Sequence, residues 1–563
     1  MKAPDPGQPA FEASIDIESP SMRMSAPLSM LLLILPMSLV WAQDSEDSLL
    51  QNRLKAHIEF LAADELRGRE AGTDGYRIAA SYVASQFRQM GLLPAGSEDS
   101  FYQQVPLRRS WSVEGSVGMR FENGNTKVEF EYVNEFYQGA SLAHENSEIS
   151  AEMVFVGYGI DAPALDYTDF DGVDIEGKIA VALAGQPIDF PSEEGAHFGS
   201  RAEKLKALVA RGAIGTITVF TPRTEKRFAW ERVESLVGKS GMGWLSESGT
   251  PFRSYPEIKG GVLIHYTPAA ALFEETDHTL EALIEMDRTG QNLPVFPMKG
   301  TVNIIQKSRH ETIFSPNVVA LLPGTDPVLS SEYLVYTAHL DHIGELHGDG
   351  HDDAINNGAL DNASGVSVML ETARMFKESG DTRRSILFLA VTAEEKGLVG
   401  SEYFAQNPTV PDGSMVAVIN LDMPLLLYQF GDVIAFGAEH STMGASVEQA
   451  AGEFGAVLTP DPFPEQNIFV RSDHYPFVQK GIPSVFLVTG PTSLDGEENT
   501  LPIIEGFLKE HYHRVSDDLN LPINYSAAAR FTRINARVGE IVANKTERPA
   551  WNEGNFFGTT FSR

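Results

Sequence analysis

Two adjacent carboxylates, Glu394 and Glu395, come just after the apolar run SILFLAV, which is typical of a buried strand. Neighbouring anions at the end of a strand repel each other and lose hydration, so they need a cation or a proton donor nearby. A solvated turn is the alternative, because most charged side chains in proteins are exposed. The side chains near the other apolar runs of the chain decide between these two interpretations.

Imidazole and carboxylate side chains also follow the other apolar runs or lie in loops beside them: His339, Asp341, His342, Asp361, Asp422, His511 and His513. Such donors suit a hard-to-borderline divalent metal, with zinc first. Each residue alone is more often structural. A single Asp before a helix, such as Asp361, usually caps it, and His347 and His351 in the run HGDGHDD are interpreted as solvated.

The elements that would position these side chains are short strands alternating with helices. Val366, Leu370, Ala373 and Phe376 form a helical stripe, and four runs are apolar enough for strands buried on both faces: EYLVYTAHL, SILFLAVTA, MVAVINLDM and SVFLVTG. This alternation predicts an α/β fold with a mostly parallel central sheet flanked by helices. Because ligands bind beyond the carboxyl ends of such strands, the imidazoles and carboxylates should meet at one sheet edge.

Competing catalytic signatures are missing from the sequence. It contains no His-Glu-x-x-His motif and no Gly-x-Ser-x-Gly elbow. The stretch GVDIEGKI matches a phosphate-binding loop only up to Ile179, where a serine or threonine is required. The lack of cysteine excludes a thiolate nucleophile, a cysteine zinc site and disulfides.

Six motifs, in this order, carry a resemblance to a known family: AHLDH, GALDNASG, TAEEKGLVGS, NLDM, RSDHYPF and YHRVSDD. They resemble the co-catalytic zinc exopeptidases that include bacterial leucyl aminopeptidase, aminopeptidase Y and glutamate carboxypeptidase. The resemblance covers about Pro316 to Val542, together with the GREAGT segment near the N-terminus. It implies two zinc ions per chain.

The resemblance places the metal ligands on five residues, with His339 and Asp422 on one zinc, Glu395 and His513 on the other, and Asp361 bridging both. It also implies a cis peptide bond after Asp361 and a role for Asp341 in orienting the imidazole of His339. Consecutive side chains in extended structure point to opposite sides. Glu395 can therefore reach a metal ion while Glu394 faces the attacking water as the general base. His511 is a minor competitor of His513.

We therefore expect an exported zinc aminopeptidase that hydrolyses the N-terminal bond of peptide substrates with a two-metal activated water. A carboxypeptidase is the first alternative and needs a cation for the terminal carboxylate, for which Arg471 is the evident candidate. A glutaminyl cyclase would use one metal, and the five-ligand set argues against it. A non-catalytic binding protein would lack a ligand or the base, and none is missing.

Export is expected because residues 22–43, MRMSAPLSMLLLILPMSLVWAQ, have the features of a secretory signal peptide, with translation starting at Met22 or Met24. After cleavage we expect no membrane span and a periplasmic or extracellular location. The net charge of -34 argues against nucleic-acid and anionic-membrane partners. The expected segments are 1–42 (leader and signal peptide), 43–146 and 302–545 (peptidase domain), 147–301 (an insert resembling the protease-associated domain) and 546–563 (an irregular tail).

Overall fold

The computed structural model describes residues 34–346 and 353–562. Most of the expected signal peptide, together with His347 and His351, lies outside the described residues. The chain divides into two compact units, Met1–Leu49 and Leu50–Arg563. In the first unit, the described residues form the beginning of helix α1 (Ile34–Leu61). No helix in the described part of the chain has the length and apolar character of a membrane span.

The first sheet of the larger unit has four parallel strands at its centre. β14 (Tyr333–His339) lies between β15 (Ser385–Val391) and β16 (Met415–Asn420), and β19 (Ser484–Thr489) pairs with β16. Further strands extend the two edges: β11 (Gly241–Trp244), β2 (Tyr102–Ser112), β1 (Leu93–Pro94) and β13 (Val295–Leu322) beyond β15, and β17 (Asp432–Phe436) and β18 (Val457–Thr459) beyond β19. The expected α/β fold with a mostly parallel sheet is confirmed.

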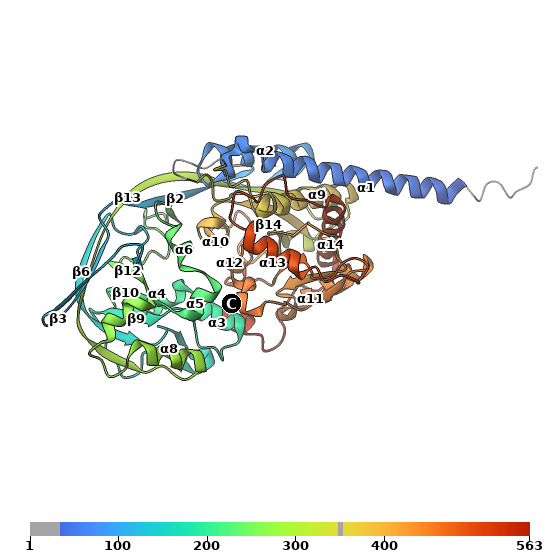
Figure 1. Cartoon of the computed structure of the whole chain (residues 1–563). Coiled ribbons are helices and arrows are strands. Elements are labelled where there is room, and N and C mark those ends of the chain that lie inside the picture. The colour runs from blue at the N-terminus through green and yellow to red at the C-terminus, as the bar shows by residue number, and fades with distance from the viewer. Residues whose placement is uncertain (1–33, 347–352, 563) are drawn as a thin grey trace, which may run out of the picture. The chain divides into compact units, whose positions relative to one another are not determined.

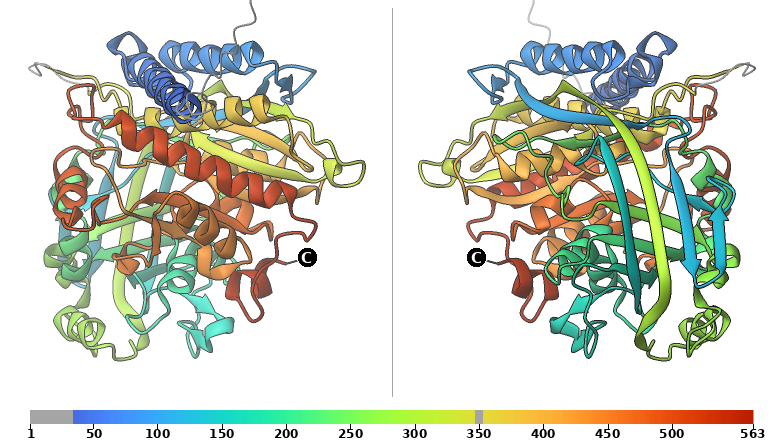
Figure 2. Two further views of the ribbon diagram at one scale, coloured as in Figure 1. Left: turned by 90° about the vertical axis from the view of Figure 1, so that its right-hand side faces the viewer. Right: turned by 90° about the vertical axis from the view of Figure 1, so that its left-hand side faces the viewer.

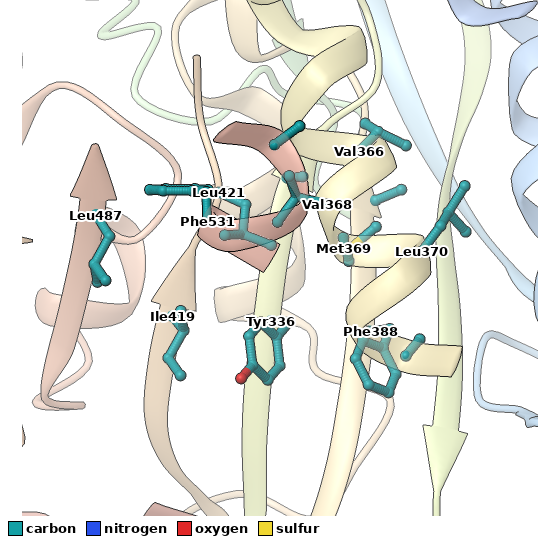
Figure 3. Close-up of a cluster of buried hydrophobic side chains, with 14 of the residues drawn as sticks. Tyr336, Val366, Val368, Met369, Leu370, Phe388, Ile419, Leu421, Leu487 and Phe531 are labelled. Atoms are coloured by element: carbon teal, nitrogen blue, oxygen red, sulfur yellow. The ribbon is translucent and has the colours of Figure 1, made fainter. Parts of the chain in front are cut away.

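Helices cover both faces of this sheet: α2 (Asp74–Gln89), α9 (Gly365–Ser379), α10 (Val399–Gln406), α11 (Met443–Glu453), α12 (Tyr475–Val478), α13 (Leu501–Glu510) and α14 (Tyr525–Asn544). Side chains of alternate β14 residues enter two different cores, because neighbouring strand residues point to opposite faces. Tyr336 packs with α9 and α14 in one core (Figure 3), whereas Val335 packs in the other core, which includes Phe404 of α10 and Phe477 of α12. The sheet is thus buried on both sides.

A second sheet shares the long strand β13 with the first, as Figure 2 shows for the yellow-green strand in its right-hand view. Its strands, in spatial order, are β4 (Thr126–Phe130), β3 (Gly118–Asn123), β13, β6 (Asn146–Val156), β9 (Ile179–Leu183), β10 (Gly215–Phe220), β12 (Gly260–His265) and β5 (Phe136–Tyr137). The remaining elements of this region are α3 (Ser192–Gly199), α4 (Arg201–Val209), α5 (Pro222–Arg227), α6 (Trp230–Glu234), α7 (Tyr266–Ala269), α8 (Leu280–Thr289) and the small pair β7 (Asp161–Ala162) and β8 (Tyr167–Thr168).

The strand pairing differs from the expected segment limits in two places. Strands β3 to β5 precede residue 147 but belong to the second sheet, and β11 lies within 147–301 but pairs with β2 of the first sheet. The tail also differs from expectation, because residues Phe556–Phe561 form helix α15. The side chain of Asn555 accepts a hydrogen bond from the N–H of Gly558 and caps this helix, and Phe557 is fully buried.

Candidate metal centre

The strand ends of the first sheet bring the expected ligands to one edge. His339 is the last residue of β14, and it lies in register with Val391, the last residue of β15. Three residues after Val391 the chain turns into a short 3-10 helix, Glu394–Lys396, which carries the carboxylate pair. Asp422 follows the end of β16 by two residues. Parallel strands therefore deliver one imidazole and three carboxylates to the same side.

Two further ligands come from loops that pack against this edge. Asp361 lies in a short π-helical segment, Ala359–Ser364, that leads into α9. Its peptide bond to Asn362 is cis, as the family resemblance implied. His513 lies in the turn after α13 and has a left-handed backbone conformation, with φ of 58°. All five expected ligands thus reach one place from five separate segments.

The carboxylate of Asp361 lies between the other four residues. Its Oδ1 is 3.2 Å from Nε2 of His339, which is also 3.1 Å from Oδ1 of Asp422. Its Oδ2 is 3.2 Å from Nε2 of His513, which is also 3.1 Å from Oε2 of Glu395. The site therefore consists of two halves, each with one imidazole and one terminal carboxylate, that share the Asp361 carboxylate.

The charges at the site show why it suits cations. Burial alone would raise the pKa of Asp361, but hydrogen bonds from His339 and His513 hold it well below its ordinary value. Burial alone would lower the pKa of His513, but Glu395 and Asp361 raise it to about 11. The carboxylates thus need positive charge beside them. Two divalent metal ions would satisfy this need, and imidazole and carboxylate are ligands that zinc accepts.

Only part of the site is open. His339, Asp361 and Glu395 have side chains that are nearly fully buried, whereas the His513 side chain is 38% exposed. The half that contains His513 is therefore the more accessible half.

The Asp341 carboxylate does not bond to the His339 imidazole, which was its expected partner. Nδ1 of His339 lies 3.1 Å from the main-chain carbonyl oxygen of Asp341, so the main chain rather than the carboxylate orients the imidazole. The carboxylate instead accepts hydrogen bonds from the N–H groups of Glu394, at 3.0 Å, and Glu395, at 3.4 Å. The reason is geometric: the chain turns after His339, which points the Asp341 side chain toward the end of β15. Asp341 is therefore a positioning residue for the carboxylate pair.

The charges of residues in both halves of the site act on Glu394, which is not one of the five expected ligands. Burial raises the pKa of its carboxyl well above the ordinary value; His339 opposes this shift, and the Glu395 carboxylate adds to it. A carboxylate with a raised pKa accepts a proton more readily, which suits a general base.

Several residues that hold the ligands were not anticipated from the sequence. Asp517, in the motif YHRVSDD, accepts hydrogen bonds from the N–H groups of Leu360 and Asp361 at 2.9 and 3.0 Å. The side chain of Asn362 donates to the carbonyl of Leu421 and accepts from the N–H of Met423. These bonds tie the bridging segment to the Asp422 loop. In the sequence, both residues lie inside the six motifs listed above, which does not reveal their partners.

The Asp422 carboxylate is held by Ser472 of the motif RSDHYPF. The Ser472 hydroxyl donates to Oδ2 of Asp422 and accepts from the side-chain amide of Asn420 at 2.7 Å. Oδ1 of Asp422 is the atom that faces His339. The Ser472 bond therefore leaves one oxygen of Asp422 for a metal ion.

Arg69, in the GREAGT segment, is the buried cation of the region. Its guanidinium donates to the carbonyls of Leu61, Leu340, Asn357 and Gly358. Burial lowers the pKa of Arg69 to about 10, while the carboxylates of Asp517, Asp361, Asp341 and Glu395 oppose this shift. The hydrogen bonds of the Arg69 side chain therefore connect the end of α1, the end of β14 and the loop before Asp361.

Two other candidates lie outside the ligand cluster. Nδ1 of His511 is 3.0 Å from the hydroxyl of Ser516, so His513 alone of the two histidines enters the site. Arg471 is exposed and donates to the carbonyl of Gln466.

His342, which was considered as a possible ligand but not assigned, lies inside the site, with Nδ1 2.7 Å from Oε1 of Glu395.

Comparisons with known proteins find sequences similar to the part of the chain that carries the site. Residues 317–539 match the sequence model described as peptidase family M28. A probable leucine aminopeptidase 2 of Aspergillus oryzae is 28% identical over 219 residues, which cover 37% of this chain and 41% of that protein. A glutamate carboxypeptidase 2 homolog of Caenorhabditis elegans is 27% identical over 314 residues, covering 49% of this chain and 38% of the other. The matched stretches span about two fifths of the length of these relatives.

Among solved structures, an aminopeptidase from Aneurinibacillus sp. strain AM-1 has a similar fold. The TM-score is 0.52 at 21% sequence identity, and the match covers 89% of this chain and 98% of that one. The likeness therefore extends over both sheets.

Proposed function

Residues 317–539 of this chain belong to peptidase family M28, and from this premise we propose that the protein is a two-zinc exopeptidase that acts as an aminopeptidase on peptides. One observation carries the proposal: the Asp361 carboxylate presents one oxygen to His339 and the other to His513. A carboxylate shared in this way is the arrangement that a pair of metal ions requires of a bridging ligand.

The five ligands would hold the two ions in the arrangement that the family resemblance implies. His339 and Asp422 would bind one ion, Glu395 and His513 the other, and Asp361 both. Bound zinc would polarise the scissile carbonyl and make a water molecule acidic enough to attack it near neutral pH.

The residues around the ions have separate tasks. Glu394 accepts the proton of the attacking water and returns it to the leaving amine, which is the work of a general acid–base group. Asp341 holds the main chain of Glu394 and Glu395, so that the two carboxylates keep their positions relative to each other. Ser472 holds the Asp422 carboxylate, and Asp517 holds the main chain of Asp361.

A carboxypeptidase is the second candidate. Arg471 is exposed, and its charge acts on Tyr512, whose ring lies 3.9 Å from that of His513. An exposed guanidinium whose charge reaches Tyr512 is a candidate anchor for a terminal carboxylate. The relative named as a glutamate carboxypeptidase 2 homolog is a further reason to test this activity.

The test compares two kinds of reporter peptide with the purified protein. An aminopeptidase releases the first residue of aminoacyl reporters, and acetylation of the substrate amine abolishes the reaction. A carboxypeptidase cleaves acetylated peptides that have a free carboxyl terminus. Chelation should abolish either activity and zinc should restore it. Glu394→Gln serves as the inactive control, and Glu439→Gln, an exposed position, as the matched active one. Activity that resists chelation would contradict the proposal.

We also propose that the protein is exported and that the mature chain begins near Gln43. The support is the sequence pattern of residues 22–43 described above. Mass spectrometry of the amino terminus, after expression with the native leader, tests this proposal. Recovery of the intact leader on protein from the extracellular or periplasmic fraction would contradict it.

A further inference from the structure

His342 is a buried imidazole beside the metal ligands that has no task in the function proposed above. It follows Asp341 at the end of β14 and is fully buried. Nδ1 lies 2.7 Å from Oε1 of Glu395 and 4.0 Å from Oδ2 of Asp361. The ring stands edge-on to that of His513, with centroids 5.9 Å apart. It therefore touches the more accessible half of the site from its buried side.

The surrounding main chain makes room for this imidazole and fixes it. The N–H of His342 donates to the carbonyl of Arg69 at 3.3 Å. A Cβ atom at Gly358 would lie 2.7 Å from the His342 ring, so only glycine fits there while the ring keeps its place. Gly358 also has φ of 61°, and its carbonyl accepts from the Arg69 guanidinium at 3.1 Å. The position of the ring is thus determined by contacts on two sides.

The hydrogen-bonding partners of the ring select one tautomer. A carboxylate oxygen only accepts hydrogen bonds, so Nδ1 must carry the hydrogen that meets Glu395. Nε2 is buried and has no hydrogen-bond partner among residues 34–346 and 353–562. A buried N–H group without an acceptor costs more free energy than a buried ring nitrogen that carries no hydrogen and has no donor. The arrangement fits an imidazole that carries its hydrogen on Nδ1.

We infer that His342 is a positioning residue that occupies Oε1 of Glu395 through its Nδ1–H group and so presents Oε2 alone to the metal ion shared with His513. Oε2 is the oxygen 3.1 Å from Nε2 of His513. Asp341 holds the main chain of Glu395, so one short segment holds this ligand at both ends. The inference rests on the proposed two-metal function and adds a residue to it. Groups that orient a metal ligand from outside typically change metal affinity by about 10- to 100-fold.

The test uses three substitutions that separate the hydrogen-bond donor from the ring. In His342→Asn the side-chain amide nitrogen can take the place of Nδ1, whereas in His342→Gln it lies one bond farther out, and His342→Ala has no donor. Zinc affinity of both sites is measured by chelator competition, without any assay of activity. We expect His342→Asn to bind both ions as the wild type does. His342→Ala and His342→Gln should lose about 10- to 100-fold at one site only.

A control and a second measurement make the outcomes decisive. His144→Asn, a histidine of the second-sheet region bonded to the Pro256 carbonyl, should leave both zinc affinities unchanged. Equal zinc binding by all three His342 variants and the wild type would overturn the inference, as would a loss in His342→Asn as large as that in His342→Ala. Nitrogen NMR of the metal-free protein, labelled at histidine, should show His342 with hydrogen on Nδ1, and hydrogen on Nε2 alone would overturn the inference. A wild-type protein that binds only one zinc ion would refute the two-metal function. The NMR result would then still show whether Nδ1 of His342 carries the hydrogen that meets Glu395.

Discussion

Replacing Arg69 by methionine should lower the free energy of unfolding by about 3 to 5 kcal/mol. The guanidinium is buried, and the carbonyl of Gly358, one of its four acceptors, also accepts from the N–H of Ala363. The variant therefore leaves three buried carbonyls without this donor: those of Leu61, Leu340 and Asn357. At about 1 to 3 kcal/mol for each, the cost is about 3 to 9 kcal/mol. Relief from burying a cation offsets part of this cost.

The assay is the shift of the urea unfolding midpoint relative to the wild type. Arg77→Met is the matched control, because Arg77 is exposed on α2 and pairs only with Asp74 at the surface among the described contacts. The control should change stability by no more than about 0.5 kcal/mol. Arg69→Lys should fall between them, because one ammonium group cannot span four carbonyls. Equal midpoints for Arg69→Met and Arg77→Met would refute the reasoning.

Three further predictions concern the site. Glu394→Gln should keep both zinc ions while turnover falls by about 10²- to 10⁴-fold. Glu395→Gln should lose one zinc ion, and excess zinc should partly restore its activity. Elemental analysis and kinetics measure both effects, and the reverse pattern would show that the two roles are exchanged. Ser472→Ala should weaken zinc binding at the site that contains Asp422 by about 10- to 100-fold, as measured by chelator competition, and unchanged affinity would contradict this. Asp517→Asn should weaken binding of both ions, because Asp517 holds the main chain of the bridging ligand; loss of one ion alone would contradict that role.

The strand ends could be predicted from the sequence because the strands are buried on both faces. Runs such as SILFLAV must be apolar throughout in such a sheet, so a polar residue marks the place where the strand ends. His339 and Asp422 follow from this reasoning, and the structure brings both to one edge. The assignment of ligands to two metal ions needed the family resemblance as well, and it remains a proposal.

The supporting contacts could not be predicted, because their partners are distant in the sequence or depend on a turn. Arg69 donates to carbonyls that are about 270 to 290 residues away in the sequence, and no local sequence pattern predicts such a bond. The carboxylate of Asp341 points to the end of β15 rather than to His339 because of the local turn. In the same way, the alternation of apolar and charged residues in the run VEFEYV, residues 128–133, indicates strand structure but not the sheet that the strand joins.

The most direct test of the two-metal account is a zinc titration of the metal-free protein, with bound zinc and turnover measured in the same samples. The account predicts that two ions bind per chain and that full activity appears only when the second has bound. It also predicts that Asp361→Asn weakens both binding events, since both halves of the site share this carboxylate. Full activity with one zinc per chain or none would contradict the account.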